Sequence, residues 1–158
     1  MTTSSSGLYG NFGQTNYGSA KMGVIGMMNT LVQEGAKYNI KVNALAPTAG
    51  TRMTEGLIPE KAFDLLTPET VTPAVLYLVS EDAPTRIIMA AGAGAYSIAK
   101  IVETDGVWLS PEDQTPEGIA ANWDAITSPE GEAVPQAGFE QTVKFTGKAA
   151  AGLGIDLS

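Results

Sequence analysis

An α/β fold is predicted by three features of the sequence: one long segment of helical periodicity, two short strand-like runs, and the order in which they follow one another. Residues 15–37 carry apolar side chains at about 3.6-residue spacing, which is the period of a helix. Residues 40–46 then form a short, largely apolar run that ends before Pro47, as a strand does. Helix, short loop and strand are half of a βαβ unit, so a parallel sheet is expected. The periodic positions of the helix are Tyr17, Lys21, Val24, Met28, Leu31 and Val32.

Shorter elements are expected between residues 59 and 91. Residues 59–66 and 68–80 each open with a proline, which is tolerated in the first turn of a helix, and both are predicted to be helical. Residues 86–91 are apolar and are predicted to form a second strand. The glycine- and threonine-rich residues 48–56 are interpreted as the loop that follows the first strand.

Beyond Gly92 the sequence becomes rich in residues that favour turns, and a loop-rich extension is expected. Residues 116–126 are the one clear helical stretch predicted there, with Thr115 as its cap. Residues 143–145 are strand-like, and the glycine- and alanine-rich residues 146–154 are predicted to form a flexible tail.

Composition excludes several functional classes. The formal charge is −8, from 17 acidic and 9 basic residues, so neither nucleic acid nor an anionic membrane surface is expected as a partner. With no Cys and no His, the chain has no disulfide, no thiolate nucleophile, no Ser-His-Asp triad and none of the usual zinc sites, and no metal is expected. No targeting or membrane-spanning segment is visible, so a cytoplasmic location is expected.

Tyr17 and Lys21 are four residues apart, which on a helix places a phenol and an ammonium on one face. A phenol is a poor base in water because its pKa is about 10, and a nearby cation favours the phenolate. Such a tyrosine suits proton exchange with an alcohol substrate. Ser4, thirteen residues earlier, is expected on the strand-to-loop turn before the helix, where its hydroxyl would stabilise charge on the substrate oxygen.

Spacing by itself is weak evidence, because Tyr96 and Lys100 repeat it. The second pair has Ala83 where the first has Ser4, and it follows a Gly-Ala-Gly turn in place of opening a long helix. We therefore interpret Tyr96 as an ordinary packed tyrosine and Lys100 as a solvated lysine.

The context of the first pair is more specific. Residues 3–21, TSSSGLYGNFGQTNYGSAK, resemble the active-site segment of short-chain dehydrogenases/reductases. Within that superfamily, residues 7–14, 29–31, 37–40 and 43–54 resemble the (3R)-hydroxyacyl-CoA dehydrogenase part of peroxisomal multifunctional enzyme type 2 and its bacterial relatives. Residues 107–117 and 122–126 look like the C-terminal extension of bacterial members.

The resemblance implies a fold and a division of the chain. The implied fold is the C-terminal part of a Rossmann-like doubly wound parallel sheet, incomplete, with a loop-rich C-terminal extension. Residues 1–97 would form the second half of the dehydrogenase domain, and residues 98–158 an extension of the same domain. The family's glycine-rich pyrophosphate turn does not precede Ser4, so the N-terminal half is expected to be missing. Residues 146–154 approach that turn's pattern but are one position out.

The resemblance also implies the site residues. Ser4, Tyr17 and Lys21 would be catalytic, and Tyr17 and Lys21 would also contact the cofactor. The loop after the first strand would meet the nicotinamide, and its matching residues are Pro47, Ala49, Gly50 and Thr51. Thr48 stands where the family more commonly has glycine. NAD is the expected cofactor and NADP stays open, because the residue that reads the ribose 2′ position would lie in the missing half.

Three functions remain open from the sequence. The leading one is oxidation of (3R)-hydroxyacyl-CoA, or reduction of the matching ketoacyl thioester, in fatty acid metabolism. The second is a truncated, non-catalytic chain that pairs with itself or with a homologous full-length subunit through the Tyr17 helix. The third keeps the enzyme and changes the substrate to a ketoacyl-carrier protein, a steroid or a small aldehyde, since the loop over residues 52–66 varies across the superfamily.

Overall fold

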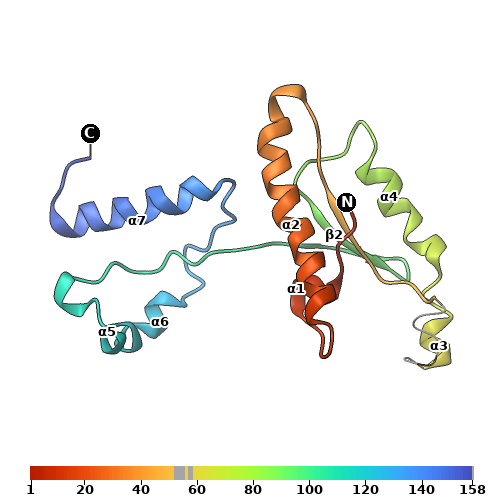
Figure 1. Ribbon diagram of the computed structural model, residues 1–158, viewed down its shortest axis with the longest axis horizontal. Helices are drawn as coiled ribbons and strands as arrows, with labels where there is room; N and C mark the ends of the chain where they lie inside the picture. The colour runs from red at the N-terminus through yellow and green to blue at the C-terminus, as the bar shows by residue number, and fades with distance from the viewer. Residues whose placement is uncertain (52–55, 57–58, 158) are drawn as a thin grey trace. The chain divides into compact units, whose positions relative to one another are not determined.

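The computed structural model describes residues 1–51, 56 and 59–157 (Figure 1). These residues form two compact units, Met1–Ala99 and Lys100–Ser158, which are taken in turn below. The first unit contains α1 (Ser5–Tyr9), α2 (Thr15–Gly35), a 3₁₀ turn (Ala36–Tyr38), β1 (Ala44–Pro47), α3 (Glu60–Phe63), a 3₁₀ turn (Pro68–Thr70), α4 (Thr72–Leu78), β2 (Ile88–Gly92) and β3 (Ala95–Ala99).

The sheet of the first unit has the order β1-β2-β3, with β1 parallel to β2 and β2 antiparallel to β3. Residues 1–3 extend it, because Thr2 forms a parallel bridge with Leu45. The amide of Thr3 donates to the carbonyl of Leu45 at 2.8 Å, and the amide of Leu45 donates to the carbonyl of Met1 at 2.9 Å. Residues 1–3, β1 and β2 therefore run parallel, as the α/β interpretation requires.

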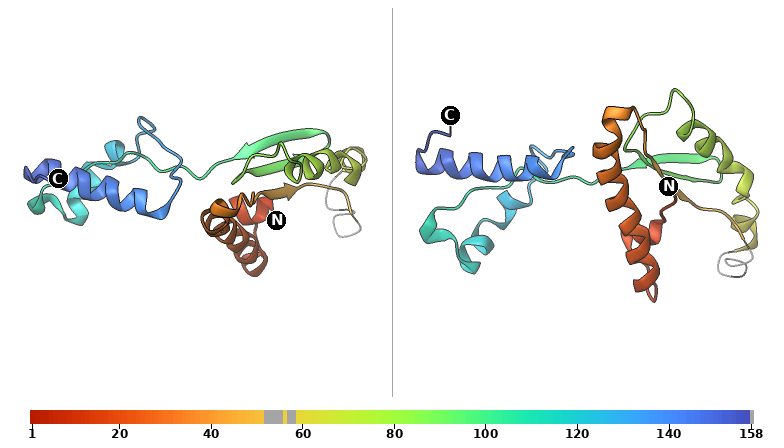
Figure 2. Two further views of the ribbon diagram at one scale, coloured as in Figure 1. Left: turned by 90° about the horizontal axis from the view of Figure 1, so that it is seen from above. Right: turned by 45° about the horizontal axis from the view of Figure 1, so that its top comes forward.

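Helices cover both faces of this sheet (Figure 2, left). On one face Ile25 and Met28 of α2 pack against Ala44 and Ile88. On the other face, Leu45 and Ala91 pack with three residues from the α4 region, Val71, Ala74 and Leu78. Successive residues of β1 thus point to opposite layers, which is the doubly wound arrangement expected from the sequence.

The long helix agrees with the prediction, but the face that it buries is turned relative to the predicted one. Ile25 and Met28 are fully buried, whereas Tyr17 and Leu31, both counted as part of the periodic face, are 43% and 38% exposed. Ile25 was not among the predicted positions. Val24 and Ile25 lie four and three residues before Met28, and both are apolar, so periodicity alone did not distinguish the buried stripe from its neighbour.

The strands are shorter at their starts than predicted. β1 begins at Ala44, and residues 41–43 before it belong to no regular element. The Asn43 side chain donates to the carbonyl of Pro84 at 2.7 Å and accepts from the amide of Ile87 at 2.9 Å. β2 begins at Ile88 since Arg86 has a left-handed backbone (φ 64°), which a strand cannot include.

The predicted helices 59–66 and 68–80 are also shorter. The first is reduced to α3, Glu60–Phe63, and in the second a 3₁₀ turn precedes α4. Prolines at 59 and 68 begin these segments as expected, but each lies just outside the regular helix or inside the 3₁₀ turn.

The second unit contains a 3₁₀ turn (Pro111–Asp113), α5 (Pro116–Ala121), α6 (Trp123–Ile126) and α7 (Gly138–Leu153). The Thr115 hydroxyl accepts from the amide of Gly118 at 3.0 Å, which confirms it as a helix cap. The predicted helix over 116–126 is divided at Asn122, whose side-chain amide donates to the carbonyl of Gly118.

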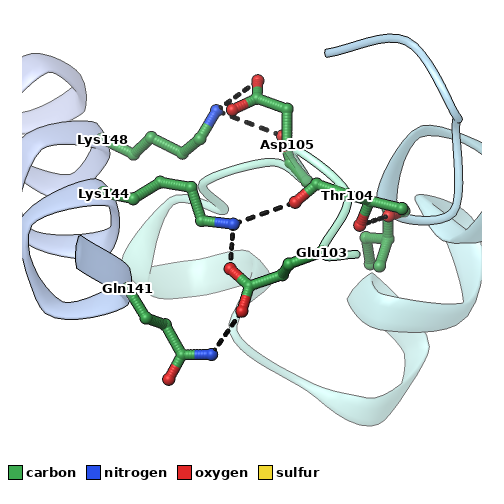
Figure 3. A network of polar contacts seen from close by, with 8 residues as sticks. Glu103, Thr104, Asp105, Gln141, Lys144 and Lys148 are labelled. Carbon is green, nitrogen blue, oxygen red and sulfur yellow. Dashed lines mark hydrogen bonds and ion pairs between the residues drawn. The ribbon is translucent and has the colours of Figure 1, made fainter. Parts of the chain in front are cut away.

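The prediction of a strand-like stretch followed by a flexible tail is wrong, because residues 138–153 form the regular helix α7. Its Gln141, Lys144 and Lys148 lie on one face and bind the extended segment 103–106 (Figure 3). Gln141 and Lys144 donate to the Glu103 carboxylate, and Lys148 donates to Asp105 at 2.7 Å. These partners are some 40 residues away in sequence, with separations of 38 to 43, so local propensity did not reveal them.

Two glycines give a matched test of how α1 packs on α2. A Cβ added at Gly7 would lie 2.8 Å from Lys21 Cβ and 2.9 Å from the Met22 amide nitrogen, whereas one added at Gly23 would meet nothing within 4 Å. We expect Gly7→Ala to lower the free energy of unfolding by about 1–3 kcal/mol through overpacking. Gly23→Ala should raise it by up to about 1 kcal/mol through helix propensity. Denaturant titration measures both, and equal effects of one sign would contradict this packing.

The contacts in Figure 3 predict an acid-sensitive second unit. The hydrogen bond from Lys144, helped by one from Gln141, lowers the pKa of Glu103, and the bond from Lys148 lowers the pKa of Asp105. A carboxyl whose folded pKa is depressed stabilises the fold above its unfolded pKa, and that contribution is lost as the pH falls through the folded pKa. We expect amide exchange in α7 to accelerate, relative to its intrinsic rate, below about pH 4.

Glu103→Gln should make this acceleration shallower, because one of the titrating carboxyls is gone. Glu130→Gln serves as the control, since Glu130 is exposed and its side chain takes no part in these contacts. An unchanged pH dependence in Glu103→Gln would show that the contacts do not hold α7.

Candidate functional site

The candidate site lies where two parallel segments end. Thr2 is bridged to Leu45, so Ser4 and Pro47 each come two residues later on neighbouring segments that run in the same direction. The carboxyl ends of adjacent parallel strands therefore bring Ser4 and the loop after Pro47 to one edge of the sheet. In open α/β sheets ligands bind outside this edge.

Ser4 is the residue at which the extended segment turns into α1. Its backbone is extended (φ −160°, ψ 153°), and its hydroxyl oxygen caps α1 by accepting from the amide of Ser6 at 3.2 Å. Ser4 thus ends the extended segment as expected, but the next element is the short helix α1, where a loop was predicted. Among the described residues none accepts a hydrogen bond from the Ser4 hydroxyl, so its proton is available to a substrate oxygen.

Two close approaches hold α1 on α2 (Figure 1). Gly7 faces the backbone of Lys21 and Met22, and Gly18 faces the carbonyl of Ser6, from which an added Cβ would be 3.0 Å. Among the glycines of α2 this close approach is specific to Gly18, because a Cβ added at Gly23 or Gly26 would meet nothing within 4 Å.

Lys21 and Tyr17 are neighbours on α2. The Lys21 ammonium lies 5.7 Å from the centroid of the Tyr17 ring and donates to the carbonyl of Thr2 at 3.1 Å. Tyr17 is 43% exposed, and no described residue forms a hydrogen bond with its phenol oxygen. A cation, an accessible phenol and the Ser4 hydroxyl are thus carried by elements that meet at residues 1–4.

The loop that was expected to meet the nicotinamide begins at the same edge. Pro47 ends β1 and is exposed, and the next amide, of Thr48, donates to the carbonyl of Ala91 at 2.8 Å. Ala49 packs on the core of the first unit, while Gly50 donates to the carbonyl of Leu66 at 2.6 Å and faces the Phe63 ring. Thr51 follows and is exposed.

Only part of the expected substrate loop, residues 52–66, is described by the structure. Within 52–66, residues 52–55, 57 and 58 lie outside the described residues. The part that is described contains α3, whose Phe63 ring contacts Gly50.

The second tyrosine–lysine pair is separated from this chemistry by its secondary structure. Tyr96 belongs to β3, and its hydroxyl donates to the carbonyl of Thr70 at 2.9 Å. Lys100 follows the strand, so the two residues do not share a helix face. Tyr96 is therefore held by a hydrogen bond, but at 47% exposed it is not the packed tyrosine that was predicted.

Sequence reasoning missed one residue of the site. Thr3 is 1% exposed, and its hydroxyl donates to the backbone carbonyl of Lys21 at 2.7 Å. A polar residue in an otherwise unexceptional run of Thr and Ser gave no signal of burial, because only the pairing with β1 places it inside.

The described residues contain neither a carboxylate metal site nor a membrane-spanning helix. Across residues 1–51, 56 and 59–157, no three carboxylates come together in a way that could hold a metal ion. No helix in the same ranges is both long and apolar enough to cross a bilayer.

Comparison with known proteins gives consistent matches. The family described as short chain dehydrogenase matches residues 1–62. The chain is 46% identical, over 141 residues, to a short-chain type dehydrogenase/reductase of Mycobacterium tuberculosis, covering 89% of this chain and 48% of that protein. It is 42% identical to peroxisomal multifunctional enzyme type 2 of Mus musculus, over 90% of this chain and 20% of the relative.

A solved structure agrees. Full-length peroxisomal multifunctional enzyme type 2 from Drosophila melanogaster matches with a TM-score of 0.79 and 33% identity, over 98% of this chain and 28% of that one. The chain thus spans about half, or less, of the length of these relatives. The family match covers the segment that carries Ser4, Tyr17 and Lys21, and the chain belongs to the short-chain dehydrogenase/reductase family.

Proposed function

We propose that this chain contributes the Ser-Tyr-Lys site of an oxidoreductase that transfers a hydride between a nicotinamide cofactor and a hydroxyacyl or ketoacyl thioester, such as (3R)-hydroxyacyl-CoA. The observation that supports the proposal is that Lys21, next to Tyr17 on α2, donates to the carbonyl of Thr2, two residues before Ser4, at the carboxyl-end edge of the parallel sheet.

The three side chains divide the chemistry between them. The Tyr17 phenol exchanges a proton with the substrate's alcohol or carbonyl oxygen, which is general acid–base catalysis. The Ser4 hydroxyl donates a hydrogen bond to the same oxygen and stabilises the charge that develops on it. The Lys21 ammonium, 5.7 Å from the Tyr17 ring centroid, favours negative charge on the phenol oxygen.

The described residues fit one end of the cofactor. A bound nicotinamide would supply the hydride acceptor or donor, and the exposed edge formed by Pro47 and the following loop, with Lys21 beside it, would hold the ring and its ribose. Residues 146–154 resemble a pyrophosphate turn but belong almost entirely to α7, whose backbone amides are engaged in the helix. They therefore do not serve the pyrophosphate. NAD is proposed over NADP on the resemblance alone.

The acyl thioester substrate is supported by the relatives' names. The matched proteins include an acetoacetyl-CoA reductase from Synechocystis, 40% identical over 54% of this chain, and a 3-oxoacyl-[acyl-carrier-protein] reductase from Thermotoga maritima, 46% identical over 49%. Both names denote the reduction of a ketoacyl thioester. A substrate of that class suits this site, because its reacting oxygen is a single carbonyl or alcohol oxygen that could bind both the Ser4 hydroxyl and the Tyr17 phenol.

The proposal predicts a large loss of activity for one tyrosine and almost none for the other. The assay is the hydroxyacyl-CoA-dependent reduction of NAD by the full chain, alone and mixed with a full-length homologous subunit that has been inactivated at its own tyrosine. Tyr17→Phe should lower kcat by about 10²- to 10⁴-fold. Tyr96→Phe, with the same Tyr-x-x-x-Lys spacing, should change kcat by less than about twofold, because Tyr96 only bonds to a carbonyl.

Full activity in Tyr17→Phe would contradict the assignment of Tyr17 as the acid–base residue of the site. An absence of turnover by the unsubstituted chain in both settings would reject the catalytic proposal and leave the pairing function described next. Circular dichroism of each variant shows whether a loss of rate accompanies a loss of fold.

A second candidate function is pairing with a second copy or a homologous subunit through α2. Beside its buried stripe the helix carries a row of exposed side chains at helical spacing: Tyr17 and Met27 are 43% and 51% exposed, and Leu31 is 38% exposed. A second copy carries the same row, so two copies related by a twofold axis would bury the two rows of side chains against each other.

Met27→Glu should convert such a pair into monomers, because it places a charge in the middle of the row. Ser19→Glu is the control, since Ser19 is exposed on a different face of α2. Sedimentation velocity with the full chain alone, and mixed with a full-length homologue, distinguishes self-pairing from pairing with a homologue. Identical sedimentation of Met27→Glu and the unsubstituted chain would rule out this surface.

A further inference from the structure

Thr3 is the most deeply buried polar residue at the site. Its side chain is 1% exposed, and it is one of the three largest side chains among those described as fully buried, with Ile25 and Met28. A buried hydroxyl requires a hydrogen-bond partner. The partner is the backbone carbonyl of Lys21, at 2.7 Å and 18 residues away in sequence.

Residues 2 and 3 of the extended N-terminal segment hold both the backbone and the side-chain end of Lys21. Its carbonyl oxygen accepts from the Thr3 hydroxyl at 2.7 Å, and its ammonium donates to the carbonyl of Thr2 at 3.1 Å. The strand segment is itself fixed, because the Thr3 amide donates to Leu45 at 2.8 Å. The backbone and the ammonium of Lys21 are thus both hydrogen-bonded to the same two residues, Thr2 and Thr3.

The same contact bears on the other two side chains. Ser4 follows Thr3 directly, and Tyr17 lies one turn before Lys21 on α2. Gly7 of α1 also approaches Lys21 so closely that no side chain fits between them. Lys21 therefore contacts both the strand segment and α1, and the bond from Thr3 ties its backbone to the strand segment.

We propose that Thr3 is a positioning residue, whose buried hydroxyl fixes Lys21, and with it Tyr17, relative to Ser4. The inference rests on the proposed function for its catalytic meaning. Its structural content, the immobilisation of Lys21 by Thr3, stands independently and is tested independently.

The test compares Thr3→Val, which keeps the shape and removes the hydroxyl, with Thr3→Ser, which keeps the hydroxyl. Thr30→Val is the matched control: the Thr30 hydroxyl also donates to a carbonyl of α2, that of Gly26 at 3.2 Å, but it is exposed and remote from Lys21. The first measurement is NMR of the full chain labelled with ¹³C lysine, in which Lys61, an exposed lysine, is the reference.

In the unsubstituted chain the two Hε protons of Lys21 should give separate signals, unlike those of Lys61. Thr3→Val should merge them and accelerate amide exchange in the turn after Lys21 by about tenfold, the effect of losing one buried hydrogen bond. Thr3→Ser should restore both properties, and Thr30→Val should leave both unchanged.

Merged Lys21 signals in the unsubstituted chain, or separate signals in Thr3→Val, would overturn the proposal. The former needs no variant, so the test survives a Thr3→Val chain that does not fold. The second measurement is kinetic: Thr3→Val should lower kcat per folded molecule with KM unchanged, whereas a residue needed only for folding would lower the amount of folded protein. If Tyr17→Phe keeps its activity, the proposed function fails while the NMR result still decides the role of Thr3.

Discussion

The parallel pairing of residues 1–3 with β1 is the interaction on which the site depends. It makes Thr3 a buried residue and brings its hydroxyl to Lys21, and it places Ser4 level with Pro47 at the edge of the sheet. α2 is attached to the sheet through this segment as well as through Ile25 and Met28. Without the pairing, Ser4 and Tyr17 would be related only through the packing of α1 on α2, and Ser4 would not be held level with Pro47.

α2 has two adjacent faces with different surroundings. One face packs on the sheet through Ile25 and Met28, and the other leaves Met27 and Leu31 accessible. Tyr17 stands at the start of the exposed face, which explains how a residue of the longest helix keeps its phenol free of partners among the described residues. A helix that is apolar on more than one side is commonly shared between two partners. The proposed catalysis and the proposed pairing are therefore compatible on one helix.

The second unit is organised by polar contacts more than by a core. Along α7, Ala150 is its buried residue, while Lys144 and Lys148 reach carboxylates and carbonyls of the extended segment 103–106. Trp108 packs where Gly152 leaves room on the helix. Contacts of this kind depend on pH and on single charges, so this unit is expected to respond to conditions that leave the apolar core of the first unit unaffected.

The sequence by itself determined the α/β class, the extent of α2, the cap at Thr115 and the family of the Ser4, Tyr17 and Lys21 segment, because periodicity, capping and motif are local properties of the chain. Only the tertiary structure decided which face of α2 is buried, that α7 is a helix, and that Tyr96 belongs to a strand. For α7 the reason is contacts between residues some 40 positions apart, such as Lys148 with Asp105, which outweigh local preference. Tyr96 is placed in a strand by the antiparallel pairing of β3 with β2, in which it lies opposite Ala91. Thr3 belongs to this second group, since its burial comes from a strand pairing 43 residues away in sequence.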